Sequence, residues 1–273
     1  MNRKWLSAVV LLPVLFMGAC NSRKAPSGSI ELTVFAAASL TETLEQIAVL
    51  YKNTSPNVSL VFNFDSSGTL KTQIQEGAEC DVFLSAGQRQ MDQLDITANP
   101  SVNTEGLDFV LQGTRVDLLE NKVTLCVPEG NPAGIINFAD LADKLANGNI
   151  LFAMGNSDVP VGQYTQSILA FFGLDEDVLA HNGRITYGSN VKEVTTQIKE
   201  GSVSCGVVYC TDAFSAGLEI VDYATVEMCG QIIYPAAVLK TGKNSEAANG
   251  FLAFLKTDAA MEVFKKVGFT APL

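Results

Sequence analysis

The fold of this chain is indicated first by the stretch Phe35-Ala36-Ala37-Ala38-Ser39-Leu40-Thr41-Glu42. It follows a β-prone run at residues 32–35 and leads into apolar side chains at helical spacing, namely Leu40, Leu44, Ile47, Ala48 and Tyr51. Ser39 and Glu42 have the spacing of a capping box, so one interpretation is that Ser39 only caps its helix. The alternative is that Ser39 and the first N–H groups of the helix bind an anion.

The same order of strand, small or hydroxyl residue and helix recurs along the chain, which predicts an α/β fold with mainly parallel sheet. We expect strands at residues 58–64, 81–86, 122–127, 150–154, 184–187, 204–209 and 231–239, and helices at residues 69–76, 88–94, 138–146, 191–200, 245–256 and 258–267, with one more after Pro160. Ligands of open α/β sheets bind beyond the carboxyl ends of the strands. The turns that contain Ser39, Ser67, Val161 and Val191 are therefore candidates to meet at one small anion.

Length, charge and composition narrow the class of protein. The 273 residues, 47% of them hydrophobic, are enough for two lobes or one large domain. The formal net charge of −11 argues against a nucleic-acid partner, because phosphate binding depends on clustered Lys and Arg. A bound anion must therefore be held by local, oriented hydrogen-bond donors.

The N-terminus has the pattern of a targeting segment. Arg3 and Lys4 precede an apolar stretch at residues 6–19, which is too short to span a membrane, and we expect residues 1–19 to be a signal peptide. Met17-Gly18-Ala19-Cys20 resembles a bacterial lipobox, which implies cleavage before Cys20 and lipid attachment to its sulfur. Residues 20–29 would then be the lipidated cysteine and a polar linker.

The remaining chemistry-bearing residues do not indicate an enzyme or a metal centre. Beyond Cys20 the cysteines are Cys80, Cys126, Cys205, Cys210 and Cys229, an odd number that cannot all pair in one chain. Most of them lie in apolar runs, which favours free buried thiols, with one disulfide as the alternative. With one histidine, His181, and no Cys-x-x-Cys, a zinc site is poorly supported. The chain also lacks a Gly-x-Ser-x-Gly elbow, a His-Glu-x-x-His pair and a Walker phosphate loop.

Two candidate residues have ordinary structural interpretations beside the functional one. Ser67 lies in the turn Ser66-Ser67-Gly68-Thr69 and could be a helix cap or an anion contact. Asp65 must point away from a bound anion in the second case, and we expect it to cap a backbone group. Tyr209 ends an apolar strand and could be a core tyrosine whose hydroxyl needs a partner.

Taken together, several segments resemble the molybdate-binding proteins of bacterial ABC importers. They are Val34-Phe35-Ala36-Ala37-Ala38-Ser39-Leu40-Thr41, Phe64-Asp65-Ser66-Ser67-Gly68-Thr69-Leu70, residues 78–86, Val159-Pro160-Val161-Gly162-Gln163-Tyr164, Gly206-Val207-Val208-Tyr209 with Asp212-Ala213, residues 234–238 and residues 264–269. The resemblance covers essentially the whole chain after the linker, in order.

This resemblance implies a two-lobed, type II periplasmic-binding-protein fold, α/β in class, with the ligand in the cleft between the lobes. We expect lobe 1 at residues 30–118 plus 235–273 and lobe 2 at residues 119–234. The implied ligand is molybdate or tungstate, held through its oxygens with no direct metal ligands and no cofactor. The implied contacts are the hydroxyls of Ser39, Ser67 and Tyr209 and the backbone N–H groups of Val161 and Val191.

The expected function is therefore an extracytoplasmic solute-binding lipoprotein, not an enzyme. Its partners would be the membrane permease and ATPase of an ABC importer, and the membrane through the lipid anchor, and we expect a monomer. The alternative in the same class is a binder of another tetrahedral oxyanion such as sulfate. The alternative in a different class is an extracytoplasmic enzyme or sensor domain on the same fold.

Overall fold

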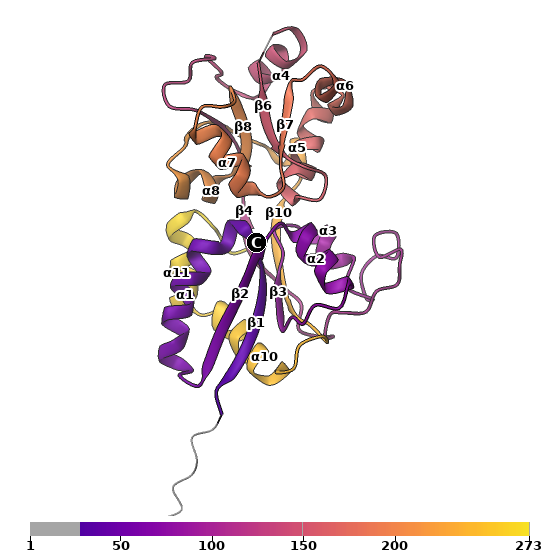
Figure 1. Ribbon diagram of the computed structural model, residues 1–273, viewed down its shortest axis with the longest axis vertical. Coiled ribbons are helices and arrows are strands. Elements are labelled where there is room, and N and C mark those ends of the chain that lie inside the picture. Colours follow the sequence, from indigo (N-terminus) through magenta and orange to yellow (C-terminus); the bar gives the residue numbers. More distant parts are fainter. Residues whose placement is uncertain (1–27, 149, 273) are drawn as a thin grey trace, which may run out of the picture.

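Two lobes, each built on a five-stranded sheet, lie one above the other in the computed structural model (Figure 1). The structure describes residues 28–148 and 150–272, so the expected signal peptide and the expected lipidation at Cys20 lie outside the described residues. Within those residues, none of the helices combines the length and apolar character that a membrane span requires.

The first lobe has the strand order β2-β1-β3-β10-β4. Its strands are β1 (Ile30–Ala37), β2 (Val58–Asp65), β3 (Val82–Leu84), β4 (Val116–Asn121) and β10 (Ile232–Val238). Its helices are the 3-10 turn η1 (Ala38–Leu40), α1 (Thr41–Thr54), α2 (Ser67–Gln75), α3 (Gln88–Asp92), α10 (Ser245–Leu255) and α11 (Asp258–Val267). In Figure 1, α1 and α11 lie on one side of this sheet and α2 and α3 on the other.

The second lobe has the strand order β7-β6-β8-β5-β9. Its strands are β5 (Val123–Val127), β6 (Phe152–Gly155), β7 (Ile185–Gly188), β8 (Cys205–Tyr209) and β9 (Glu219–Tyr223). Its helices are α4 (Phe138–Asn147), α5 (Pro160–Phe171), α6 (Glu176–His181), α7 (Val191–Lys199), α8 (Cys210–Ala216) and α9 (Val226–Cys229).

Four strands of each sheet run in one direction and the fifth runs against them, so each sheet is mixed although mainly parallel in direction. In the first sheet β10 is antiparallel to both of its neighbours, and in the second sheet β5 is. The reason is that β10 and β5 each enter their sheet from the other lobe, whereas the other strands end at the junction. The carboxyl ends of those other strands therefore point toward the opposite lobe. The predicted α/β class and two-lobed architecture are confirmed.

The chain passes between the lobes directly after β4 and directly before β10, whose labels lie at the junction in Figure 1. The boundaries expected from the sequence, 118/119 and 234/235, lie inside these two strands. Both strands belong to the first sheet along their length. We therefore propose residues 30–121 plus 232–273 for lobe 1 and residues 122–231 for lobe 2.

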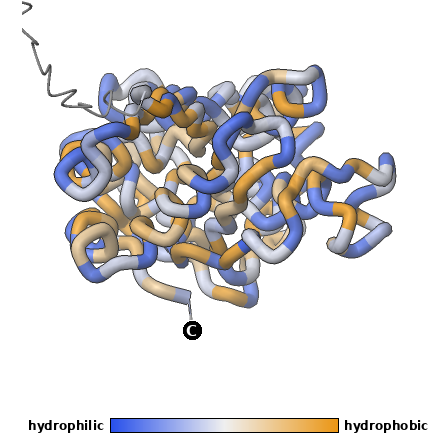
Figure 2. Tube along the Cα trace, turned by 90° about the horizontal axis from the view of Figure 1, so that it is seen from below, coloured by the Kyte–Doolittle hydropathy of each residue, from blue (hydrophilic) through white to orange (hydrophobic). Residues whose placement is uncertain are grey.

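The core forms where apolar side chains repeat at the expected spacing. Along α1, Leu44, Ile47 and Tyr51 are buried, and the Tyr51 ring packs on Phe251 of α10 with ring centroids 5.1 Å apart. Hydrophobic and hydrophilic positions alternate along the outer segments of the molecule (Figure 2). The sequence prediction missed β4, β9, α6, α8 and α9, which are short or edge elements with weak periodicity.

Candidate functional site

Ser39 lies at the carboxyl end of β1, inside the 3-10 turn that precedes α1. The expected capping box is wrong: neither the turn nor α1 has a side-chain cap, and α1 begins only at Thr41. Because Ser39 lies within the turn, its side chain points inward and its Oγ lies 3.0 Å from the hydroxyl of Tyr234. Ser39 is buried, with 5% of its surface exposed.

Ser67 lies in the first turn of α2, and its neighbour Ser66 is the residue that caps this helix. The Ser66 hydroxyl accepts the N–H of Thr69 at 3.1 Å. Ser67 Oγ instead accepts the N–H of Ala86 at 2.9 Å, and Ser67 is fully buried. Asp65 Oδ1 accepts the N–H of Ser66 at 2.7 Å, which confirms the expectation that this carboxylate caps a backbone group.

Val191 offers its backbone N–H at the start of α7. The Asn190 side chain accepts the N–H groups of Lys192 and Glu193, at 3.0 and 3.2 Å. The N–H of Val191 is outside this cap, and first-turn N–H groups have no acceptor within their own helix.

Val161 follows Pro160, which occupies the first position of α5 and has no N–H, so Val161 offers the first N–H of that helix. Gly162, the next residue, is required for close packing of α5 on the segment after β6. A Cβ on Gly162 would lie 2.3 Å from the carbonyl oxygen of Asn156, so this glycine allows α5 to approach the end of β6.

Tyr209 ends β8 in the second lobe, and its side chain reaches the first lobe. Its hydroxyl donates to the carbonyl oxygen of Ala86 at 3.2 Å. Burial raises the pKa of Tyr209 well above its ordinary value, with the nearby Tyr234 adding to the effect. The phenol therefore keeps its proton at neutral pH and acts as a hydrogen-bond donor. Ala86, which contacts Ser67 through its N–H and Tyr209 through its carbonyl, was not predicted.

A small cavity lies where these residues meet. Its lining residues come from strand ends and helix starts of both lobes: Ala37, Ala38, Ser39, Asp65, Ser66, Ser67, Ala86, Val159, Pro160, Val191 and Tyr209. Four of the five predicted site residues are among them, and the fifth, Val161, directly follows the lining residue Pro160. The cavity volume is about 10 Å³, which is about the space that one water molecule requires.

The lining provides hydroxyl and helix N-terminal N–H donors and contains no Lys, Arg or His. Asp65 is the one lining residue with a carboxylate, and this carboxylate accepts the backbone N–H of Ser66 as described above. The arrangement can thus bind an anion through neutral donors, which are effective where water is excluded.

An ion-pair cluster joins the lobes beside this cavity. Lys192 of α7 lies 2.8 Å from Glu42 of α1 and 3.3 Å from Asp212 of α8. Asp212 is buried, and apart from the contact with Lys192 neither carboxylate oxygen has a partner with good hydrogen-bond geometry. Burial raises the pKa of Asp212 to about 6, although Lys192 acts in the opposite direction. Burial acts to lower the pKa of Lys192, but Asp212 and Glu42 outweigh it and raise the pKa, so Lys192 stays charged.

A further close contact between the lobes is at Gly68 in α2. A Cβ at this position would lie 2.1 Å from the backbone oxygen of Asp158. Nearby, Gln90 Nε2 donates to Gln163 Oε1 at 3.2 Å, from α3 to α5. The two lobes are therefore closed on each other around the cavity.

Tyr234 and Asn121 are functional candidates that the sequence interpretation missed. Tyr234 was noted only as part of the run at residues 234–238, and Asn121 was not singled out. The signal that could have identified Tyr234 is a tyrosine in an otherwise apolar strand, because a buried phenol needs a hydrogen-bond partner.

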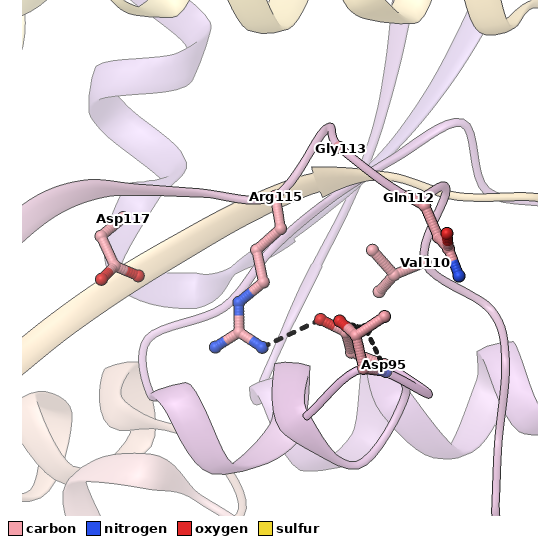
Figure 3. A pocket seen from close by; sticks show the side chains of 7 residues that line it. Asp95, Val110, Gln112, Gly113, Arg115 and Asp117 are labelled. Carbon is pink, nitrogen blue, oxygen red and sulfur yellow. Dashed lines mark hydrogen bonds and ion pairs between the residues drawn. The ribbon is translucent and has the colours of Figure 1, made fainter. Parts of the chain in front are cut away.

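A larger cavity of about 430 Å³ lies elsewhere in the first lobe and does not suit an anion. Arg115 is its one cationic lining residue, and this side chain already pairs with Asp95 at 3.2 Å (Figure 3). It also pairs with Asp92 at 2.6 Å. Asp117 adds another carboxylate to the lining. Among the described residues, no group of three or more His, Cys, Asp or Glu side chains could hold a metal ion.

Comparison with known proteins gives consistent matches over nearly the whole chain. The family described as bacterial extracellular solute-binding protein matches residues 32–270. A Bacillus subtilis protein named "Putative ABC transporter substrate-binding lipoprotein YvgL" is 32% identical over 96% of this chain and 95% of its own length. The molybdate-binding protein ModA of Haemophilus influenzae is 30% identical, over 90% of this chain and 92% of its own length. The solved structure of the Azotobacter vinelandii periplasmic molybdate-binding protein is 24% identical, covers 89% of this chain and 100% of its own, and has a TM-score of 0.73.

Proposed function

The chain is a ModA-type member of the bacterial extracellular solute-binding protein family, and we propose that it captures molybdate, and also tungstate, in the cavity between its lobes. The observation that carries this proposal is the meeting of hydroxyl and N–H donors from both lobes at one cavity without a cationic side chain. The proposed contacts are Ser39, Ser67, Val161, Val191 and Tyr209.

Molybdate and tungstate are dianions that can accept hydrogen bonds at every oxygen and have no proton to donate. A site made of donors satisfies them, whereas a protonated phosphate would place its O–H against another donor. Sulfate has the same hydrogen-bonding character, so its rejection would depend on size, because Mo–O and W–O bonds are longer than S–O bonds. The absence of a cationic lining residue also lets the anion leave when the lobes separate.

Binding requires a local rearrangement, because the cavity is smaller than a tetrahedral oxyanion. The Tyr209 hydroxyl donates to Ala86 here, and we propose that it turns to the anion when the lobes admit it. Ser67 needs no such change. Its oxygen already accepts the Ala86 N–H, which leaves its proton for the ligand.

The chain is the solute-binding component of an ABC transporter, and we propose that it delivers the anion to a permease and ATPase in the membrane. We further propose that it is monomeric and is anchored outside the cytoplasmic membrane through a lipid on Cys20. The lipobox-like sequence before Cys20 supports the anchor, as does the name lipoprotein given to the Bacillus subtilis relative.

Isothermal titration calorimetry with molybdate, tungstate, sulfate and phosphate tests the ligand. We expect tight binding of the first two, with sulfate weaker by orders of magnitude. No heat with either metal oxyanion would refute the proposal, and preferential sulfate binding would assign another oxyanion. Ser39→Ala and Tyr209→Phe should each cost about 1–3 kcal/mol of binding free energy without a change in far-UV circular dichroism.

A further inference from the structure

The hydrogen bonds around Asn121, the last residue of β4, have a fixed direction. The backbone N–H of Lys122 can only donate, and it lies 2.8 Å from Asn121 Oδ1, so that atom is the amide oxygen. The Cys210 thiol donates to the same oxygen. The two protons on Nδ2 therefore go to Thr211 Oγ1 at 3.0 Å and to the Tyr234 hydroxyl at 3.1 Å.

The direction of the next bond follows from the burial of Tyr234. Its oxygen accepts from Asn121, and burial raises its pKa well above the ordinary value, so the phenol keeps its proton. Only 1% of Tyr234 is exposed, so this proton needs a protein acceptor. Two hydroxyls of the described residues neighbour this proton, those of Ser39 and Tyr209. Of the two, Ser39 Oγ, at 3.0 Å, is the one placed with hydrogen-bond geometry. If Ser39 donated instead, the Tyr234 proton would have to turn to the Tyr209 hydroxyl, which lacks hydrogen-bond geometry toward it.

We propose that Asn121 and Tyr234 are positioning residues that direct the proton of the Ser39 hydroxyl into the cavity. Ser39 Oγ accepts from Tyr234, so the proton of Ser39 is free to donate to an anion in the cavity that Ser39 lines. This inference rests on the proposed function. It explains how a hydroxyl that could accept as easily as donate becomes a donor, which favours a fully deprotonated oxyanion.

The test is a double-mutant cycle between Tyr234→Phe and Ser39→Ala, with molybdate dissociation constants from calorimetry. Tyr234→Phe should weaken binding about tenfold, because the Ser39 hydroxyl loses its orientation. In the Ser39→Ala background the same change should alter binding by less than about twofold. Tyr51→Phe, which removes another buried tyrosine hydroxyl of the first lobe far from the cavity, is the matched control and should bind like wild type.

Equal losses from Tyr234→Phe with and without the Ser39 hydroxyl would show a purely structural role and overturn the inference, as would no loss at all. Failure of wild type to bind molybdate would instead count against the proposed function. Asn121→Asp provides a second series, because a carboxylate accepts from Tyr234 and turns the tyrosine proton away from Ser39. Its loss should be larger in wild type than in the Ser39→Ala background, where only the added charge acts. The same loss in both backgrounds would overturn the inference.

Discussion

Closure of the lobes requires a residue without a side chain at position 68, and Gly68→Ala tests this requirement. The added Cβ would lie 2.1 Å from the Asp158 backbone oxygen and 2.9 Å from its carbonyl carbon, across the cleft. Ordinary contact begins near 3.4 Å, so the lobes must separate at this point by roughly 1.3 Å. Backbone on the far side cannot rotate away as a flexible side chain would.

The expected cost follows from the bonds that cross the cleft. Ser67 of the first lobe and Tyr209 of the second lobe reach the cavity from opposite sides, so the separation would stretch the bonds that they make to a bridging anion. An anion bridging the lobes would lose at least one hydrogen bond, worth about 1.5–3 kcal/mol when one partner is charged. We therefore expect the molybdate dissociation constant to rise about ten- to hundredfold. The melting temperature without ligand should not fall, because Ala is the better helix former by about 1 kcal/mol.

Calorimetry with molybdate, together with thermal unfolding of the ligand-free variants, measures both effects. Gly250→Ala is the matched control, since a Cβ there meets nothing closer than the Tyr51 hydroxyl at 3.6 Å. Wild-type affinity in Gly68→Ala would refute the reasoning, because it would show that the lobes bind the anion without this close approach.

Three further predictions concern charged and thiol groups. Glu42→Gln should weaken molybdate binding by less than about 1 kcal/mol, because its ion pair with Lys192 is half-exposed, and the difference should disappear in calorimetry at high salt. The pKa of Asp212 is raised to about 6 in the folded state, so the stability it contributes is complete below about pH 4 and is lost as the pH rises through 6, by up to about 3 kcal/mol. Urea unfolding at several pH values should show this decline, and Asp212→Asn should lack it. Iodoacetamide should label the half-buried Cys210 and Cys229 before the three buried cysteines, because burial hinders access and raises thiol pKa values, and peptide mass spectrometry would reveal any other order.

The sequence predicted the fold and the location of the cavity because both follow from local patterns. Each strand that ends in a small or hydroxyl residue before a helix is visible over about ten residues of sequence. Parallel strands then bring those ends to one edge of each sheet, and the two edges face each other across the cleft between the lobes. Ser39, Ser67, Val191 and Tyr209 accordingly lie around one cavity.

What the sequence did not predict depends on contacts between distant segments. Ser39 and Tyr234 are 195 positions apart, and the pattern near Ser39 indicates a helix cap that the 3-10 turn replaces. The closeness of Gly68 to Asp158 likewise exists only after the lobes meet. In the same way, the Asn121 amide donates to the hydroxyl of Tyr234, which lies on β10, a strand that enters the first sheet from the other lobe.

The position of β10 within its sheet has a consequence for the order of folding. It lies between β3 and β4, so both of those strands have an unpaired edge until the chain has been synthesised to about residue 238. The second sheet is assembled from a continuous segment and lacks no partner by then. A nascent chain can therefore complete its second lobe first. The sheet of the first lobe is completed only when β10 inserts between β3 and β4.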